Sequence, residues 1–294
     1  MTPEVEARPL LVFLNEVAGG RKLLSAVRER VESGAVSKVV VAAPQNQPAV
    51  GQLIDEGELR EAARSRVEVT MAVFHEFGIE SVGEILDPDP LLAIEDALRA
   101  HEPAEVLLSA LSGQRLGITR RDFVASAEEQ VAAAEAKLTH IPVRIEDDAI
   151  RWDVIHTLVV ATKTVASPEL VNRLKERAAA QPHRYTIVCP RSEEVPENVV
   201  VRDLASTLAA LYRAEVDATG QPMSPDPFLA VKNGIEHYRV DEVLISTYTG
   251  ESSRWLEEDL VGRVREITDK QVQHIEVGRP PAAVAAAVAE GEEK

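Results

Sequence analysis

The chain has 294 residues, which is enough for about two domains of ordinary size. Hydrophobic residues make up 45% and aromatic residues only 4%, so Val, Leu, Ile and Ala must build a core of the kind that suits buried parallel strands. The net charge of −17 excludes an extended nucleic-acid surface or an anionic membrane surface as partner, because both need a basic face.

The single cysteine, Cys189, excludes an intrachain disulfide and a cysteine-based metal cluster. The first residues form no hydrophobic signal core, and no apolar run reaches the roughly 18 residues of a membrane span. These features predict a cytoplasmic protein with no membrane association.

In the first half of the chain, short β-branched runs alternate with longer helical patterns, as in βαβ units of a parallel sheet. The expected strands are 10–15, 37–43, 79–85, 104–109 and 139–145. The expected helices are 20–32, 56–77, 90–101 and 119–137. We therefore assign a first domain to 1–146 and a linker to 147–155.

The second half repeats the alternation. Its expected strands are 157–162, 184–189, 215–221, 241–247 and 272–277. Its expected helices are 168–180, 201–214, 227–238 and 254–267. We assign a second domain to 156–280 and a tail to 281–294. The predicted fold class is α/β, with two tandem doubly wound five-stranded parallel-sheet domains.

An internal repeat supports this division. The sequence GEILDPDP at 83–90 returns as GQPMSPDP at 220–227, 137 residues later, and the same offset relates Asp122 to Asp259. In both PDP turns the aspartate is expected to cap a helix and the second proline to occupy its first position, where a missing N–H is harmless.

The doubled order of elements resembles the universal stress protein family. The shared features are the PDP turn, a fourth strand followed by a Gly/Ser/Arg loop, and a short closing strand in each copy. The resemblance implies an adenine nucleotide alpha hydrolase-like fold. Because the fifth strand commonly mediates dimerisation in that family, it also implies an intrachain pseudo-dimer of the two copies. His140 and His274 would then lie at this interface, and a further homodimer could form.

Many family members bind ATP through G-x2-G-x9-G-S/T after strand 4, where glycines let backbone N–H groups approach phosphates. Neither copy keeps this spacing. Three residues separate Gly113 from Gly117, and copy two has Ser253 in place of the second glycine. The alternative is that both loops are only capped helix entries, with Thr119 as the cap in copy one and Asp122 at its capping-box position.

Charge favours copy one as the ligand-binding copy. Arg120 and Arg121 stand where copy two has two glutamates, whose charge would repel a phosphate. At the end of strand 1, where the family usually has an acidic residue facing adenine and ribose, Asn15 and Thr162 stand instead. The candidate nucleotide- or anion-binding residues are Asn15, Gly113, Gln114, Arg115, Gly117, Thr119, Arg120 and Arg121 in copy one, and Thr162, Thr247, Gly250, Ser252, Ser253 and Arg254 in copy two.

No catalytic triad, metal-ligand spacing or catalytic carboxylate pair can be identified. We therefore predict a stress-related, non-catalytic protein in which copy one holds an adenine nucleotide, ATP or AMP, or another small anion. One alternative is an ATP-using enzyme that contacts phosphate through Gly19 and Gly20 after strand 1. The other is a ligand-free dimerisation scaffold.

Overall fold

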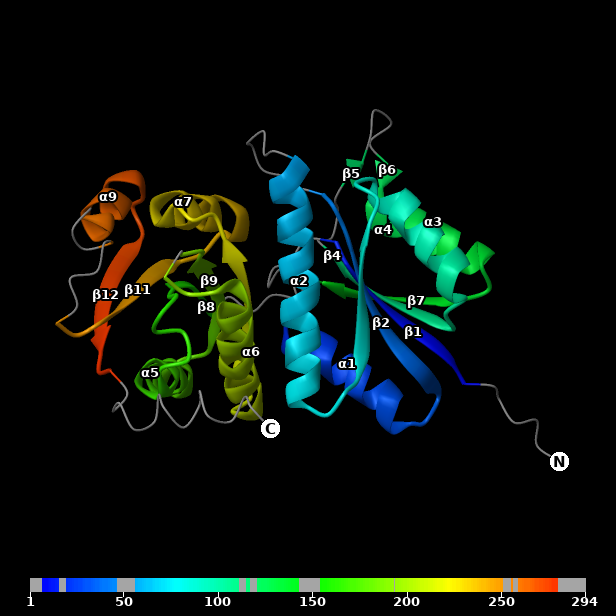
Figure 1. Ribbon diagram of the computed structural model, residues 1–294, viewed down its shortest axis with the longest axis horizontal. Helices are drawn as coiled ribbons and strands as arrows, with labels where there is room; N and C mark the ends of the chain where they lie inside the picture. Colours follow the sequence, from blue (N-terminus) through cyan, green and yellow to red (C-terminus); the bar gives the residue numbers. More distant parts are fainter. Residues whose placement is uncertain are drawn as a thin grey trace.

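The computed structural model describes residues 7–15, 20–46, 56–110, 115–116, 121–142, 154–192, 194–250, 255 and 259–279. Within these ranges the chain forms two five-stranded parallel sheets flanked by helices (Figure 1). The predicted fold class, two tandem doubly wound domains, is confirmed. The proposed domain boundaries stay predictions, since residues 143–153 lie outside the described ranges.

Domain 1 is built around the sheet with strand order β3-β2-β1-β4-β7. Its strands are β1 (Arg8–Leu14), β2 (Val36–Pro44), β3 (Ser81–Leu86), β4 (Glu105–Ala110) and β7 (Lys137–Pro142). Its helices are α1 (Arg21–Glu32), α2 (Glu56–Glu76), α3 (Pro90–His101) and α4 (Phe123–Ala133). The strand order reverses between β1 and β4, which is where open α/β sheets bind ligands, at the carboxyl ends of the strands.

Domain 2 repeats this order as β10-β9-β8-β11-β12. Its strands are β8 (Ile155–Val160), β9 (His183–Pro190), β10 (Asp217–Met223), β11 (Glu242–Tyr248) and β12 (Gln271–Val277). Its helices are α5 (Pro168–Ala180), α6 (Glu197–Arg213), α7 (Pro227–Tyr238) and α9 (Leu260–Ile267). The equivalent reversal lies between β8 and β11.

Burial on both faces explains why the strands are almost continuously apolar. In β1, Leu10, Val12 and Leu14 pack on the side of α1 and α2. Leu11 and Phe13 pack on the opposite side, with α3 and α4. A strand covered by helices on both faces needs apolar residues at successive positions, not at alternate ones.

The two PDP turns have the predicted structural role. The carboxylate of Asp89 accepts hydrogen bonds from the backbone N–H groups of Leu91 (2.9 Å) and Leu92 (3.3 Å) at the start of α3. Asp226 does the same at the start of α7, and a proline follows each aspartate at the first helical position. The repeat is therefore explained by helix capping.

A recurrent ion pair at the amino ends of the strands was missed from the sequence. Glu105 begins β4 and accepts hydrogen bonds from Arg30 of α1 at 2.9 Å and 3.1 Å. Although burial alone would raise the pKa of Glu105, the hydrogen bonds from Arg30 and Thr139 lower it. Glu242 begins β11 and pairs with Arg177 of α5 in the same way. The Arg30–Glu105 pair holds α1 against the sheet of domain 1, and the Arg177–Glu242 pair holds α5 against the sheet of domain 2.

Helices α2 and α6 join the two domains and lie side by side at the centre of the molecule (Figure 1). Ser65, midway along α2, donates to a carboxylate oxygen of Glu197 in the first turn of α6 (2.9 Å), and at the ends of both helices Arg213 donates to the carbonyl of Glu76 (2.8 Å). The helices therefore run in the same direction.

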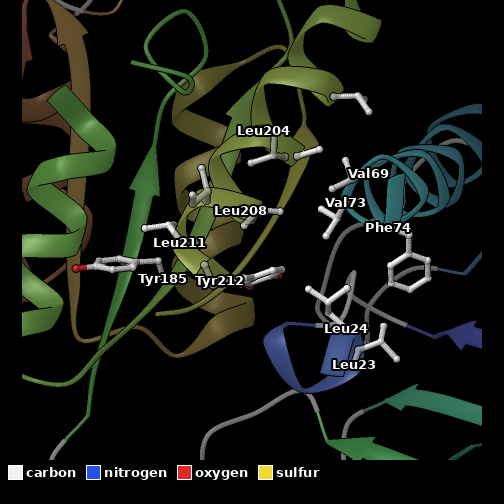
Figure 2. Packing of buried hydrophobic residues seen from close by; sticks show 14 of the residues in the cluster. Leu23, Leu24, Val69, Val73, Phe74, Tyr185, Leu204, Leu208, Leu211 and Tyr212 are labelled. Atoms are coloured by element: carbon white, nitrogen blue, oxygen red, sulfur yellow. The ribbon is translucent and has the colours of Figure 1, made fainter. Parts of the chain in front are cut away.

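A single hydrophobic cluster crosses this boundary (Figure 2). It contains, among others, Leu23 and Leu24 of α1, Val69, Val73 and Phe74 of α2, and Leu204, Leu208, Leu211 and Tyr212 of α6. Because these side chains are buried in one cluster, the two domains share a core.

The expectation that the closing strands bring the copies together is wrong for the described residues. β7 and β12 are edge strands on opposite sides of the molecule (Figure 1). His140 lies against the carbonyl of Ala110 (3.0 Å) and His274 against the hydroxyl of Thr247 (2.8 Å), each within its own domain. The apolar faces of α2 and α6 form the contact instead, because they offer more hydrophobic surface than a single strand edge.

None of the helices in the described ranges is long and apolar enough to cross a membrane.

Candidate binding crevices at the switch points

Asn15 lies where the sequence places it, directly after β1 at the carboxyl edge of the domain 1 sheet. It is fully buried, and its N–H donates to the carbonyl of Ser109 at the end of β4 (2.9 Å). Its side-chain oxygen accepts a hydrogen bond from the amide of Asn46 (2.8 Å). Asn15 therefore links the ends of β1 and β4 at the switch point. The side-chain oxygen of Asn15 is already occupied by the hydrogen bond from Asn46.

Arg66 of α2 is the functional candidate that the sequence analysis missed. It is 1% exposed, and its guanidinium donates to the carbonyls of Pro44 (2.7 Å) and Asn15 (3.3 Å) and to the side-chain oxygen of Asn46 (3.2 Å). A buried cation thus sits across the carboxyl ends of β1 and β2.

Domain 2 carries the opposite charge at the equivalent position. α2 and α6 end 137 residues apart, at Glu76 and Arg213, so Asp203 corresponds to Arg66. Burial raises the pKa of Asp203, while the neighbouring Arg202 lowers it. The negative charge of Asp203 opposes anion binding at the position where domain 1 has the buried cation Arg66.

The switch point of domain 2 is bridged by hydrogen bonds within the domain. The hydroxyl of Tyr248, at the end of β11, donates to the carbonyl of Lys163, which follows β8 (2.8 Å). Thr164 donates to the carbonyl of Ser246 (3.2 Å). The candidate Thr162 donates to the carbonyl of Pro190 (2.7 Å). These bonds join the carboxyl ends of β8, β9 and β11.

Among the other candidates of copy two, Thr247 and Gly250 lie in the described ranges, and each has a structural role. Thr247 is hydrogen-bonded to His274 of the neighbouring strand β12 (2.8 Å). Gly250 lies in the turn after β11 and adopts a φ of 69°, a left-handed conformation that favours glycine. The turn geometry alone therefore explains the glycine at this position. Ser252, Ser253 and Arg254 lie outside the described residues.

After β4, the described part of the copy one loop forms a small antiparallel pair, β5 (Arg115–Leu116) with β6 (Arg121–Asp122). In this pair Arg115 lies opposite Asp122 and Leu116 opposite Arg121, directly before the start of α4. The other candidates in this loop lie outside the described residues and stay predictions: Gly113, Gln114, Gly117, Thr119 and Arg120.

Helix α4 begins later than expected, at Phe123 instead of residue 119, because β6 occupies 121–122. Asp122 is therefore the N-cap and not the capping-box residue, and its carboxylate accepts from the N–H of Ala125 (3.0 Å). In domain 2 the predicted helix 254–267 is described only in part: Trp255 is helical, residues 254 and 256–258 lie outside the described ranges, and α9 runs from Leu260, capped by Asp259. Both helix N-termini already carry a carboxylate, and its negative charge would repel a phosphate group placed there.

The N-terminus of α1 is capped from the other domain. Asp217, the first residue of β10, accepts a hydrogen bond from the N–H of Arg21 (3.2 Å). A Cβ added to Gly20 would lie 2.6 Å from the same carboxylate oxygen. Gly20 is thus needed for the close approach of domain 2. The carboxylate of Asp217 lies at the position where the enzyme alternative would place a phosphate group. Gly19 lies outside the described residues.

The described residues near these crevices supply amide, hydroxyl and guanidinium groups for binding. Burial raises the pKa of the Cys189 thiol well above its usual range, which removes it as a thiolate nucleophile at neutral pH. No group of three or more His, Cys, Asp or Glu side chains in the described ranges could hold a metal ion.

No protein-family model and no curated protein matches the sequence. Among solved structures, the chain is similar to a universal stress protein in complex with cAMP, at 16% identity over 42% of this chain and 98% of that one, with a TM-score of 0.32. It is also similar to a universal stress protein from Archaeoglobus fulgidus DSM 4304, at 12% identity over 93% of this chain and 98% of that one, with a TM-score of 0.35.

A third similar structure is a putative universal stress protein from Pseudomonas aeruginosa UCBPP-PA14, at 12% identity over 99% of both chains, with a TM-score of 0.31. The likeness to universal stress proteins is one of fold.

Proposed function

We propose that this chain is a stress-related, non-catalytic protein of the universal stress protein type that binds an adenine nucleotide or another small anion in domain 1. Arg66 carries the proposal. Its buried guanidinium lies at the carboxyl ends of β1 and β2, next to the point where the strand order reverses. An anion bound there would form charge-assisted hydrogen bonds with it.

Domain 2 supports this proposal as a contrasting copy. It has Asp203 where domain 1 has Arg66, and the hydroxyl of Tyr248 bridges its crevice by donating to Lys163 (2.8 Å). An anion would meet a like charge and would have to break hydrogen bonds that the protein already makes. We therefore assign ligand binding to domain 1 and a structural role to domain 2.

The test is titration calorimetry of the whole chain with AMP, ATP, cAMP and inorganic phosphate. Arg66→Met removes the charge and keeps an unbranched side chain of similar length. Because hydrogen bonds to charged groups contribute about 1.5–3 kcal/mol, affinity should fall about 10- to 100-fold. Arg66→Lys, which keeps the charge, should restore part of it.

Arg99→Met is the matched control, since Arg99 is exposed on α3 and pairs only with neighbours of its own helix, Glu95 and Asp96, in the contacts described. It should bind like the wild type. Equal affinity of the Arg66→Met variant, measured on protein shown to be folded by circular dichroism, would remove Arg66 from the site.

A ligand-free scaffold is the second candidate, favoured by the carboxylates that already cap α1, α4 and α9. It predicts that none of the four ligands binds and that native mass spectrometry of purified protein finds no small molecule. The enzyme alternative requires ATP turnover that Gly20→Ala abolishes without unfolding the chain.

A further inference from the structure

We infer that domain 2 sets the ligand affinity of domain 1 by positioning Arg66 through Ser65, its neighbour on α2. The inference rests on the proposed anion site and concerns the regulation of that site. Ser65 is 1% exposed, and its hydroxyl donates to a carboxylate oxygen of Glu197 at the start of α6 (2.9 Å). A residue of domain 2 therefore holds α2 at the turn that carries Arg66.

Ser65 and Arg66 have different partners because successive side chains on an α-helix are about 100° apart. Ser65 contacts α6, whereas the guanidinium of Arg66 donates to the carbonyls of Pro44 and Asn15 at the ends of β2 and β1. Both side chains belong to one backbone turn, so α2 cannot rotate or slide away from Glu197 without displacing the guanidinium. Since hydrogen bonds weaken steeply as their geometry departs from the ideal, such a displacement would weaken the bonds that Arg66 forms with a bound anion.

Arg191 of domain 2 completes this contact. Its Nε atom lies 3.3 Å from the Oε1 atom of Glu197, the same atom that accepts from Ser65, and a terminal nitrogen of its guanidinium donates to the Ser65 hydroxyl (3.4 Å). Arg191 directly follows β9, and its backbone N–H donates to the carbonyl of Met223 at the end of β10 (3.2 Å). The three side chains therefore connect the carboxyl edge of the domain 2 sheet with α2 at the carboxyl edge of the domain 1 sheet.

A second polar contact between α2 and α6 lies at their last turns and provides a matched comparison. There Arg213 donates to the carbonyl of Glu76 (2.8 Å) and pairs with its carboxylate (3.2 Å). Glu76 is ten residues beyond Arg66, which is about 15 Å along the helix axis. A change at Arg213 therefore loosens the domain contact far from the turn of Arg66, whereas a change at Ser65 loosens it at that turn.

The test is titration calorimetry of the whole chain with AMP, ATP, cAMP and inorganic phosphate, comparing wild type, Ser65→Ala and Arg213→Met. Ser65→Ala removes the hydroxyl and keeps the guanidinium of Arg66. The affinity for each ligand that binds wild type should fall about threefold to tenfold, as for the loss of one neutral hydrogen bond. Arg213→Met should keep the wild-type affinity, although urea unfolding should show a loss of stability in both variants.

Two double variants test whether Ser65 acts through Arg66 and together with Glu197. In the Arg66→Met background, Ser65→Ala should cause no further loss of affinity, because the group that it positions is absent. Ser65→Ala combined with Glu197→Ala should lose no more affinity than the larger of the two single variants, since both changes remove the same contact.

A Ser65→Ala variant with wild-type affinity, or one whose loss persists in full without Arg66, would overturn the inference while leaving the anion site in place. An equal loss of affinity in Arg213→Met would also overturn it, because the whole domain contact and not the turn of Arg66 would then set the affinity. If none of the four ligands binds wild type, the proposed site and its regulation fall together.

Discussion

His156 of β8 is half-buried in domain 2, and its Nε2 atom lies 2.8 Å from the hydroxyl of Thr186. Burial, together with the nearby charge of Arg184, lowers its pKa to about 3. The folded protein therefore keeps this imidazole neutral at pH values where an unfolded chain would protonate it. Such a group makes stability depend on pH.

The sign follows from which state binds the proton. As the pH falls from about 6.5 toward the folded pKa, the unfolded state gains a proton that the folded state does not, so stability decreases by up to about 1.4 kcal/mol per pH unit. Urea unfolding at pH 7 and pH 5 should show this loss in wild type and a smaller loss in His156→Gln. The exposed His75→Gln serves as control. An equal loss in His156→Gln and wild type would exclude His156 as the source.

At the scale of single elements, the capping aspartates of the PDP turns offer a matched pair of measurements. Asp89→Ala and Asp226→Ala each remove a side chain that accepts two backbone N–H groups at the start of a helix. Each should lower the free energy of unfolding by about 1 kcal/mol, as for other N-caps. Asp96→Ala, on the exposed face of α3, should lower it far less. Similar losses in all three variants would argue against capping.

Most elements could be predicted because their patterns are local. The PDP turns fix the starts of α3 and α7, and continuous apolar runs such as Leu10–Leu14 mark strands buried on both faces. The start of α4 was misjudged because Thr119 also resembles a cap. Only the pairing of β5 with β6, a contact between separate segments, moves the helix start to Phe123.

The candidate site was harder to predict than the fold. Arg66 stands in the charged stretch EAARSRVE, where an arginine usually faces solvent. Its burial depends on how α2 crosses the ends of β1 and β2, which no local pattern records. The apolar residues of α2, such as Val69 and Val73, indicate a buried face but do not say that another domain covers part of it.

At the scale of the whole molecule, the shared core predicts that the two domains unfold together. Leu208 of α6 is 1% exposed within the cluster that also contains Val73 of α2 (Figure 2). Leu208→Ala should cost about 2–5 kcal/mol, as for other leucines truncated in a core. In differential scanning calorimetry we expect one transition in wild type and one, at lower temperature, in the variant.

Ala93→Gly in the separate cluster of domain 1, on α3, is the comparison, because that cluster contains domain 1 residues alone among those described. With a shared core, this change should also move the single transition. Two transitions that respond separately to the two substitutions would mean that the domains unfold independently.

The Asp217 contact also bears on how such a protein can evolve. A duplicated domain ordinarily remains complete, so that either copy can be lost or recombined. Here the N-terminus of α1 is capped by a carboxylate encoded nearly two hundred residues downstream, and that carboxylate can approach so closely only because residue 20 is a glycine. Gene fission between the halves would expose both this helix end and the apolar faces of α2 and α6. The two copies therefore depend on each other structurally, and we expect them to be retained together in one chain.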